Sequence, residues 1–237
     1  MTRTLVYLCV LLSLAACQPQ PLFPTPDDDP ATLTTDNNNI NPTTTVQVVN
    51  TRLAGTPVSV VTRADWDTLT ANNGILLAQK EHAIDTADEI DGVLINIFKP
   101  DVERYDPPTE TSDNPALTLM RYIVSRPDFV GDARVTTPDT FEWGNHSAAY
   151  YTLASDKDRR TLVIGVSVDG STDVIVFNIS VPPGETENLH ERLIDGLRSI
   201  TIDGVTLDGA DLVALPNPIS FPSTDVEIAT DNTPQSP

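Results

Sequence analysis

The sequence is poor in cysteine and in basic residues. Its 237 residues include 2 Cys and 14 Lys+Arg against 34 Asp+Glu, so the formal net charge at pH 7 is −20. A chain this acidic repels phosphate groups, which argues against nucleic-acid binding and against a polybasic contact with anionic lipid. Two cysteines are too few for a disulfide scaffold or a cysteine-rich zinc site. The length suits one domain of ordinary size with appendages, or two small domains.

The sequence signatures of common catalytic sites are also missing. There is no Gly-x-Ser-x-Gly elbow, no Ser-x-x-Lys, no glycine-rich phosphate loop, no His-Glu-x-x-His and no Cys-x-x-Cys. His82, His146 and His190 are too far apart in sequence to form a recognisable metal motif. We therefore predict a protein that is not an enzyme and that uses no cofactor or metal. A Ser/His/Asp triad assembled in space stays open, because triads are recognised by geometry.

The first 17 residues have the organisation of a secretory signal. Arg3 and the amino terminus make a short positive region, and residues 5–14 form an apolar run. The run is shorter than the roughly 20 residues that a membrane-spanning helix needs. The segment Leu14-Ala15-Ala16-Cys17 resembles the lipobox of bacterial lipoproteins, in which the signal is cut just before a cysteine that carries a diacylglyceryl group. An ordinary secretory signal, cut after Ala15, is the alternative.

The lipobox resemblance implies that Cys17 is the lipid attachment site. Two or more acyl chains give stable membrane anchoring, whereas one chain gives only marginal binding. We therefore expect the protein to be anchored on the extracytoplasmic side of the cell membrane or the outer membrane, with residues 1–16 removed as the signal peptide. Cys9 would leave with the signal, so the mature chain would contain no other cysteine.

Two terminal segments have compositions typical of disordered chains. Residues 18–45, which follow the lipidated cysteine, hold six prolines, no Lys or Arg and no apolar periodicity, so they bury too little surface to offset their ordering entropy. As a flexible tether they would hold the domain roughly 30 Å from the membrane. Residues 216–237 hold five prolines and no basic residue, which predicts a disordered tail. The globular domain is therefore expected to span residues 46–215.

Alternating apolar residues predict several strands in this domain. Residues 161–168 and 174–181 each place four apolar side chains on one face, and the turn residues between them predict a hairpin. Residues 146–154 are predicted to form a third strand of the same sheet. Further candidates are the strands 57–62, 74–79 and 93–98, and a short strand or turn at 205–207.

Two segments carry the signals of helices. Asn114-Pro115 supplies an N-cap residue and a first-turn proline, and apolar residues follow at helical spacing up to Pro127. A second helix is predicted over residues 187–199. It has an apolar stripe from Leu189 to Ile200 and acidic residues in its first turn, where the helix dipole favours them.

The order of these elements resembles that of a known family. A segment with Trp66 precedes two strands and a helix, Gly144-Asn145-His146-Ser147-Ala148-Ala149 begins the next strand, and Leu197-Arg198-Ser199-Ile200 closes the last helix. This order is similar to that of the PsbP-type extrinsic photosystem subunits and the LpqN-like mycobacterial lipoproteins. The resemblance covers about residues 57–202 and implies an α+β fold, in which an antiparallel β-sheet is flanked by helices as an α/β/α sandwich. The family has no common catalytic apparatus, and its members mostly bind or assemble other proteins.

Aromatic residues and a histidine gather around one predicted strand. Trp143, His146 and Tyr150 form a candidate binding patch, because the residues that anchor a partner are often aromatic and must be reachable in the free protein. Strand alternation places His146 and Tyr150 on one face and Tyr151 on the other, so Tyr150 is the tyrosine expected to be exposed. Packing in the core is the other interpretation of the same residues.

An acidic segment also attracts a functional interpretation. The carboxylates of Asp85, Asp88, Glu89 and Asp91 could supply oxygen ligands to Ca²⁺. Their spacing differs from that of an EF-hand, and acidic turns are common in a chain this negative. A solvated loop is therefore the competing interpretation.

The predicted function is that of a membrane-anchored extracytoplasmic lipoprotein with a non-catalytic protein-binding or assembly domain. Its expected partners are the membrane, through the lipid anchor, and another envelope protein. The alternative is an extracytoplasmic hydrolase or a solute-binding head with an unrecognised site. A deep pocket with convergent Ser, His and carboxylate groups would favour this alternative, whereas a shallow apolar or aromatic surface would favour the binding domain.

Overall fold

The computed structural model describes residues 45–71, 74–79, 92–100, 114–154, 159–168 and 174–223. The predicted signal, Cys17, residues 18–44 of the predicted tether and the acidic segment at residues 85–91 lie outside these ranges. Within them, no helix combines the length and the apolar character that a membrane crossing requires.

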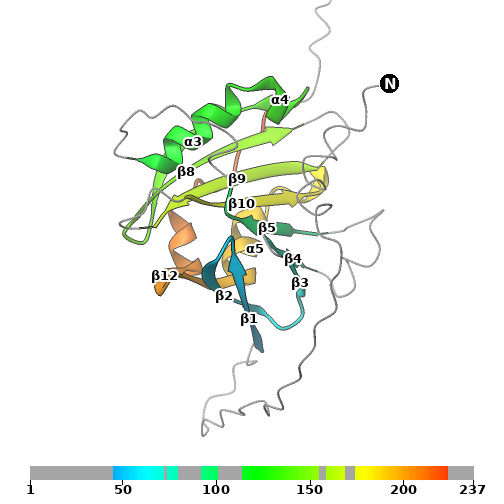
Figure 1. Cartoon of the computed structure of the whole chain (residues 1–237). Helices are drawn as coiled ribbons and strands as arrows, with labels where there is room; N and C mark the ends of the chain where they lie inside the picture. The colour runs from blue at the N-terminus through cyan, green and yellow to red at the C-terminus, as the bar shows by residue number, and fades with distance from the viewer. Residues whose placement is uncertain are drawn as a thin grey trace, which may run out of the picture.

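A small sheet forms the lower layer of the molecule in Figure 1, and its order among the described residues is β1-β2-β11-β12. All of its neighbouring strands are antiparallel. Its strands are β1 (Val46–Leu53), β2 (Thr56–Arg63), β11 (Leu197–Ile202) and β12 (Val205–Asp208). The turn between β1 and β2 includes Gly55 at φ +87°, a conformation that glycine adopts without steric cost.

A large sheet forms the second layer, with the order β3-β4-β5-β10-β9-β8-β6 and β7 paired to β8. The predicted hairpin is confirmed as β9–β10, which lies at the centre of this sheet. The predicted strands at residues 74–79, 93–98 and 146–154 are confirmed as β4, β5 and β8. The strands are β3 (Asp67–Ala71), β4 (Gly74–Ala78), β5 (Leu94–Phe98), β6 (Arg134–Val135), β7 (Asp139–Trp143), β8 (His146–Ala154), β9 (Arg160–Ser167) and β10 (Val174–Val181).

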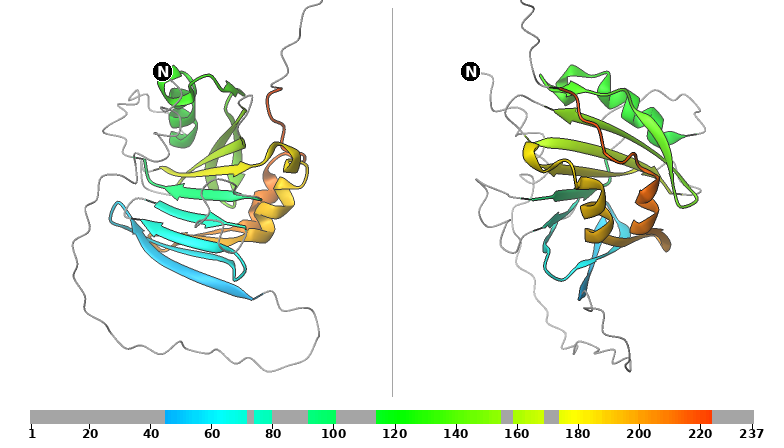
Figure 2. Two further views of the ribbon diagram at one scale, coloured as in Figure 1. Left: turned by 90° about the vertical axis from the view of Figure 1, so that its right-hand side faces the viewer. Right: turned by 180° about the vertical axis from the view of Figure 1, so that it is seen from behind.

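The two sheets face each other across the main hydrophobic core. The small sheet contributes inward side chains such as Val60 and Ile200, and the large sheet contributes side chains such as Ile97, Ile164 and Phe177. The short elements η1 (Pro183–Glu185), α5 (Leu189–Gly196) and η2 (Gly209–Ala214) follow β10 and flank β11 and β12 in the chain. α5 and η2 pack against each other and against β11, at one end of the two layers (Figure 2).

A second core covers the other face of the large sheet. There α3 (Pro115–Val124) packs Ala116, Leu119 and Met120 against β8, β9 and β10, and the short helix α4 (Pro127–Val130) follows it (Figure 1). The predicted N-cap is confirmed, because Asn114 Oδ1 accepts a hydrogen bond from the Leu117 N–H at 2.9 Å. The strands β8, β9 and β10 are therefore covered on both faces.

The fold class predicted from the sequence, an α+β domain with an antiparallel sheet flanked by helices, is confirmed by the described residues. One of the two layers that flank the large sheet differs from the sequence prediction. On the side of the large sheet opposite α3, the small sheet contributes to the same core as α5. The helical covering expected on that side is therefore mostly a second sheet.

The last predicted helix is shorter than the sequence indicates. Its pattern covers residues 187–199, whereas α5 ends at Gly196 and the chain continues as β11. A Cβ atom at Gly196 would lie 2.2 Å from the Trp66 ring, so the helix meets this ring at a residue without a side chain. The carbonyl of Gly196 accepts a hydrogen bond from Thr62 Oγ1 at 2.7 Å. Ile200, assigned to the apolar stripe of the helix, is instead buried as a strand residue.

The domain extends beyond the predicted boundary at residue 215. Residues 216–223, named here the C-terminal strap, run back along the molecule (Figure 2, right). Ile219 is only 5% exposed and belongs to the main core. The carbonyl of Ser220 accepts a hydrogen bond from Thr152 Oγ1 at 2.8 Å. The first part of the predicted tail is therefore packed, because it supplies an apolar side chain and satisfied polar groups, and residues 224–237 lie outside the described ranges.

Candidate functional site

The predicted aromatic patch is mostly core. Trp143 is fully buried, and its indole Nε1–H donates a hydrogen bond to the carbonyl of Asp208 at 2.7 Å. Its ring centroid lies 4.9 Å from that of Phe177 in β10. His146, opposite Trp143 in the β7–β8 hairpin, is also buried. Trp143 joins the hairpin to the main core, and both residues are too buried in the folded chain to anchor a partner.

The two adjacent tyrosines of β8 face opposite cores, as strand alternation predicts. Tyr151 is buried under α3, and this burial raises the pKa of its phenol above the ordinary value. Tyr150 is half-buried, and its ring packs edge-on against Phe141 with centroids 6.0 Å apart. Burial, and secondarily the charge of Asp139, raises the pKa of Tyr150. The proposed three-residue patch is thus corrected to one partly accessible tyrosine, and the core-packing interpretation holds for the other two residues.

The remaining predicted site residues divide between the core and the part of the chain outside the described ranges. His190 is buried in α5, and its Nε2 lies 3.1 Å from the carbonyl oxygen of Leu212 in η2. Cys17, His82 and the four carboxylates of the acidic segment lie outside the described ranges. Among the residues that are described, no three His, Cys, Asp or Glu side chains are placed to hold a metal ion.

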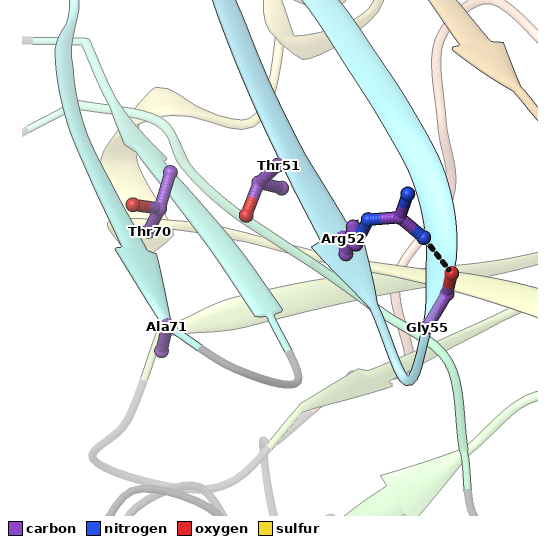
Figure 3. A pocket seen from close by; sticks show the side chains of 5 residues that line it. All are labelled: Thr51, Arg52, Gly55, Thr70 and Ala71. Atoms are coloured by element: carbon purple, nitrogen blue, oxygen red, sulfur yellow. Dashed lines mark hydrogen bonds between the residues drawn. The ribbon is translucent and has the colours of Figure 1, made fainter. Parts of the chain in front are cut away.

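A shallow hollow lies between the tip of the β1–β2 hairpin and the end of β3 (Figure 3). It is open to solvent and lined by Thr51, Arg52, Gly55, Thr70 and Ala71. Arg52 Nη1 donates to the carbonyl of Gly55 at 2.8 Å, which holds the guanidinium against the hairpin turn. None of these five described lining residues is a histidine, a serine or an acidic residue.

A cluster of aromatic and charged residues lies where α3 meets α4. We name it the α3–α4 corner and define it as Tyr122, Arg126, Asp128 and Phe129. The guanidinium of Arg126 lies 5.5 Å from the Tyr122 ring centroid and 5.4 Å from that of Phe129. The two rings are 6.2 Å apart. Both distances to the cation are within the range of cation–π attraction.

Hydrogen bonds fix the same guanidinium. Arg126 donates through Nε and Nη2 to the two carboxylate oxygens of Asp128 at 3.0 and 2.9 Å, and through Nη1 to Tyr122 Oη at 2.8 Å. These bonds hold the pKa of the Asp128 carboxyl below its ordinary value. The side chain of Arg126 is nevertheless 44% exposed. The corner therefore presents arginine and aromatic surface to solvent in a fixed geometry.

A second cluster of charges lies where the small sheet meets α5. Arg63 of β2 donates hydrogen bonds to Asp65 and to Asp195 of α5, and Asp195 also accepts one from Arg198. The hydrogen bond from Arg63 holds the pKa of the Asp65 carboxyl below its ordinary value. This network joins β2 to the helix, and a structural role explains it fully.

The outer face of the small sheet is open to solvent. On β1, side chains alternate between this face and the core, and Val46, Val48, Asn50 and Arg52 are the outward ones. Val46 and Val48 are 48% and 57% exposed. β1 is an edge strand, and among the described residues no other strand pairs with its second side (Figure 1).

The sequence interpretation missed both of these surfaces. Tyr122, Arg126 and Phe129 follow one another at spacings of four and three residues, which is the spacing of neighbours on a helix surface. This signal was available but is interrupted by Pro127. For β1, the alternation in VQVVNTRL is broken by Val49, so the pattern was weak.

Comparison with known proteins finds structural neighbours at low sequence identity. No protein-family model matches the chain, and no curated protein matches it. The solution structure of cyanobacterial PsbP from Synechocystis sp. PCC 6803 is similar at 10% identity and a TM-score of 0.39, covering 65% of this chain and 91% of that one. The Saccharomyces cerevisiae Ran-binding protein Mog1p is similar at 10% identity and a TM-score of 0.34, covering 62% and 83%. Similarity this low does not specify a function.

The fold class of the protein therefore follows from the architecture of the described residues. The described part of the protein is an α+β domain of two facing antiparallel sheets, with a solvent-open hollow beside the β1–β2 turn. The α3–α4 corner and the outer edge of the small sheet are its two candidate contact surfaces.

Proposed function

We propose that the chain is a membrane-anchored extracytoplasmic lipoprotein whose globular head is a non-catalytic protein-binding module. The observation that carries the binding role is the α3–α4 corner. Arginine and aromatic residues dominate the binding energy of many protein interfaces, particularly when they are held rigidly before the partner arrives. Arg126, fixed by Asp128 and within cation–π distance of Tyr122 and Phe129, has this character.

The geometry of the corner also indicates how a partner would contact it. Arg126 already satisfies several of its donors within the cluster, so a partner gains by covering the rings and the edge of the guanidinium rather than by supplying a new counter-ion. The short helix α4 follows α3 after a break at Arg126-Pro127, which places Phe129 beside the end of α3. A partner that covers this corner would shield the cation–π contacts from water. Such contacts are stronger when they are desolvated.

The membrane anchor rests on the lipobox at residues 14–17 and on the composition of residues 18–45. A lipidated Cys17 would fix one end of the chain to the bilayer, and the tether would give the head room to reach a second envelope protein. In this arrangement the head samples partners within the envelope without diffusing away.

A cysteine substitution tests the anchor. The Cys17→Ala variant is expected to stay uncut or to be released in soluble form, because the acyl chains supply the membrane affinity. Cys9→Ala is the matched control, since it removes the other cysteine and leaves the lipobox intact. Partition of the processed protein into detergent, with mass spectrometry of its amino-terminal peptide, measures the effect. A Cys17→Ala protein that is correctly cleaved and still partitions like the parent would overturn the lipoprotein proposal.

A capture experiment tests the binding role. The anchored chain is used as bait in detergent-solubilised membranes, and specifically retained proteins are quantified for the parent, for Arg126→Ala and for Phe129→Ala. The matched control is Arg121→Ala, an exposed arginine of the same helix outside the corner. We expect the two corner variants to lose most of the captured partner, with Arg121→Ala behaving like the parent. Equal capture by all four proteins, or no specific capture by any of them, would contradict the proposal.

A further inference from the structure

Among the described residues, no strand pairs with the edge of β1 that faces away from β2, and this long edge lacks the usual protective residues in its own sequence. β1 has eight residues and keeps an unbroken register with β2 over all of them. It contains no proline, no lysine and no acidic residue. Natural proteins normally shield edge strands with such residues, with bulges or by making the strand short, because an open edge pairs with other extended chains.

The other edge strands of the described residues are shielded. β12, at the far side of the small sheet, has four residues and ends in Asp208. In the large sheet, the edge strand β3 has five residues and begins with Asp67, and the edge strand β6 has two. The strand β7, which pairs only with β8, has five residues and contains Asp139 and Glu142. The lack of shielding is therefore particular to β1 among these five edge strands, and it coincides with two exposed valines.

Apolar exposure is concentrated on the same strand. The large hydrophobic residues that are exposed within the described ranges are Val46, Val48, Leu69 and Val213, so two of the four belong to β1. Val48 lies opposite Val61 of β2, which is half-buried on the same outer face. A strand added at the β1 edge would continue this apolar row and remove both exposed valines from water.

The charge pattern indicates which strand can be added. The whole chain carries −20, yet the four strands of the small sheet contain one acidic residue, Asp208, together with Arg52, Arg63 and Arg198. Two copies of an acidic protein repel each other wherever acidic surfaces meet, so a self-contact requires a surface from which acids are excluded. A basic partner would instead be attracted to the acidic surface elsewhere. β1 contains a single charged residue, Arg52, so two β1 strands can pair with little charge repulsion.

We propose that two copies of the chain pair antiparallel through their β1 edges, so that two small sheets join into one continuous sheet. Such an isologous contact has a two-fold axis and uses the same residues from both copies. An axis at Val48 places Val48 opposite Val48 of the second copy and Val46 opposite Asn50, all on the outer face.

The contact is expected to be weak in dilute solution and stronger on a membrane. A single strand pair buries less surface than a stable dimer interface usually does. Lipid anchoring, which rests on the proposed function, confines the copies to one surface and raises their effective concentration. The pairing itself depends only on the described strand, so its test does not require the anchor.

Cysteine cross-linking tests the pairing directly. Residues 18–237 contain every described residue and no cysteine, so a single introduced cysteine reports one contact. Val48→Cys is compared with Thr206→Cys, an exposed residue of β12 on the opposite edge of the same sheet. We expect mild oxidation to give a disulfide-linked dimer in several-fold higher yield for Val48→Cys. Equal yields for the two variants would overturn the proposal.

A charge substitution supplies a second, reversible test. In sedimentation velocity, the sedimentation coefficient of the protein comprising residues 18–237 should rise with protein concentration toward that of a dimer. Val48→Lys places two like charges on the axis and should abolish this shift, whereas Thr206→Lys should preserve it, with circular dichroism checking that both variants are folded. Either a parent that stays monomeric at every concentration, or a Val48→Lys variant that associates like the parent, would show that a second copy is not the occupant of this edge.

Discussion

The large and small sheets bury their residues differently although both are built from antiparallel strands. In the large sheet, β9 and β10 are buried on both faces, between the main core and α3. In the small sheet, β1 alternates between core and solvent and leaves two valines exposed. This contrast separates two tasks. The doubly buried strands supply stability, and the half-buried sheet and the α3–α4 corner supply surface on which contacts can change at little cost to the fold.

The largest expected difference between the sheets is a cavity effect. Phe177→Ala removes a fully buried ring that packs 4.9 Å from Trp143, and we expect a loss of about 3–5 kcal/mol in the free energy of unfolding. Val48→Ala on the outer face of β1 should change it by less than about 0.5 kcal/mol. Urea denaturation followed by circular dichroism measures both. Similar losses for the two variants would remove the distinction between the sheets.

The C-terminal strap should contribute to the stability of the fold, as the doubly buried strands do. Ending the chain after residue 215 removes buried Ile219 and the bond from Thr152 to Ser220. We expect a loss of about 2–4 kcal/mol, from the apolar burial and the hydrogen bonds together. Ending the chain after residue 223 keeps these contacts and should leave stability nearly unchanged. Thermal unfolding of the two truncated chains measures the difference, and equal midpoints would show that the strap contributes nothing.

The junction between α5 and the small sheet should be sensitive to one methyl group. Gly196→Ala would place a Cβ atom 2.2 Å from the Trp66 ring, and we expect the resulting displacement to cost about 1–3 kcal/mol. Gly184→Ala is the matched control, because a Cβ atom there meets nothing within 4 Å. The comparison uses the same denaturation measurement. A tolerated Gly196→Ala would mean that the ring moves aside and does not fix the end of the helix.

The smallest expected effect is the pH dependence of the stability that the ion pair between Arg63 and Asp65 contributes. The hydrogen bond from Arg63 lowers the pKa of Asp65 in the folded chain. A lowered folded pKa gives stability that is present above the unfolded value of about 3.9 and is lost as the pH falls through the folded pKa. Because both side chains are partly exposed, the contribution at pH 7 should be below about 1 kcal/mol.

Asp65→Asn isolates this contribution. The variant should be slightly less stable than the parent at neutral pH, and the difference should disappear in acid, once Asp65 is protonated in both states of the parent. Urea denaturation at several pH values measures it. A difference that stays constant from pH 7 into the acid range would assign the effect to packing rather than to the charge of Asp65.

Local sequence patterns predicted the elements whose conformation is decided locally. β9 and β10 carry long apolar runs bounded by turn residues, and α3 begins with an N-cap and a proline whose hydrogen bonding involves neighbouring residues. Their existence and type follow from propensity and pairing alone. The fold class was predictable for this reason.

The misplaced features all depend on contacts between distant residues. The buried residues Leu197 and Ile200 are three residues apart, which is helical spacing, and β11 accommodates them through a register shift between Leu197 and Ser199. The helix ends at Gly196, where the chain meets the Trp66 ring. The strap reads as a tail by composition, because the core that buries Ile219 comes from elsewhere in the chain. The sequence left Trp143 open between a binding patch and the core, because its partners, Phe177 and the carbonyl of Asp208, lie far along the sequence.

The candidate binding surfaces were hidden for the same reason. The rings of Tyr122 and Phe129 meet around Arg126 only after the chain turns from α3 into α4. A strand edge is open when no other strand pairs with it, and a local sequence pattern does not show which strands pair. Sequence therefore predicted the stabilising sheet better than the surfaces available for contact.

Amide hydrogen exchange resolved along the chain tests the contrast between the two sheets most directly. In dilute protein, we predict that the amides of β10 exchange only through near-global unfolding, while the outward amides of β1 exchange rapidly. Raising the protein concentration should slow exchange in β1 and leave β10 unchanged, because pairing at the edge protects β1 alone. Equal protection of β1 and β10 in dilute protein would contradict the account.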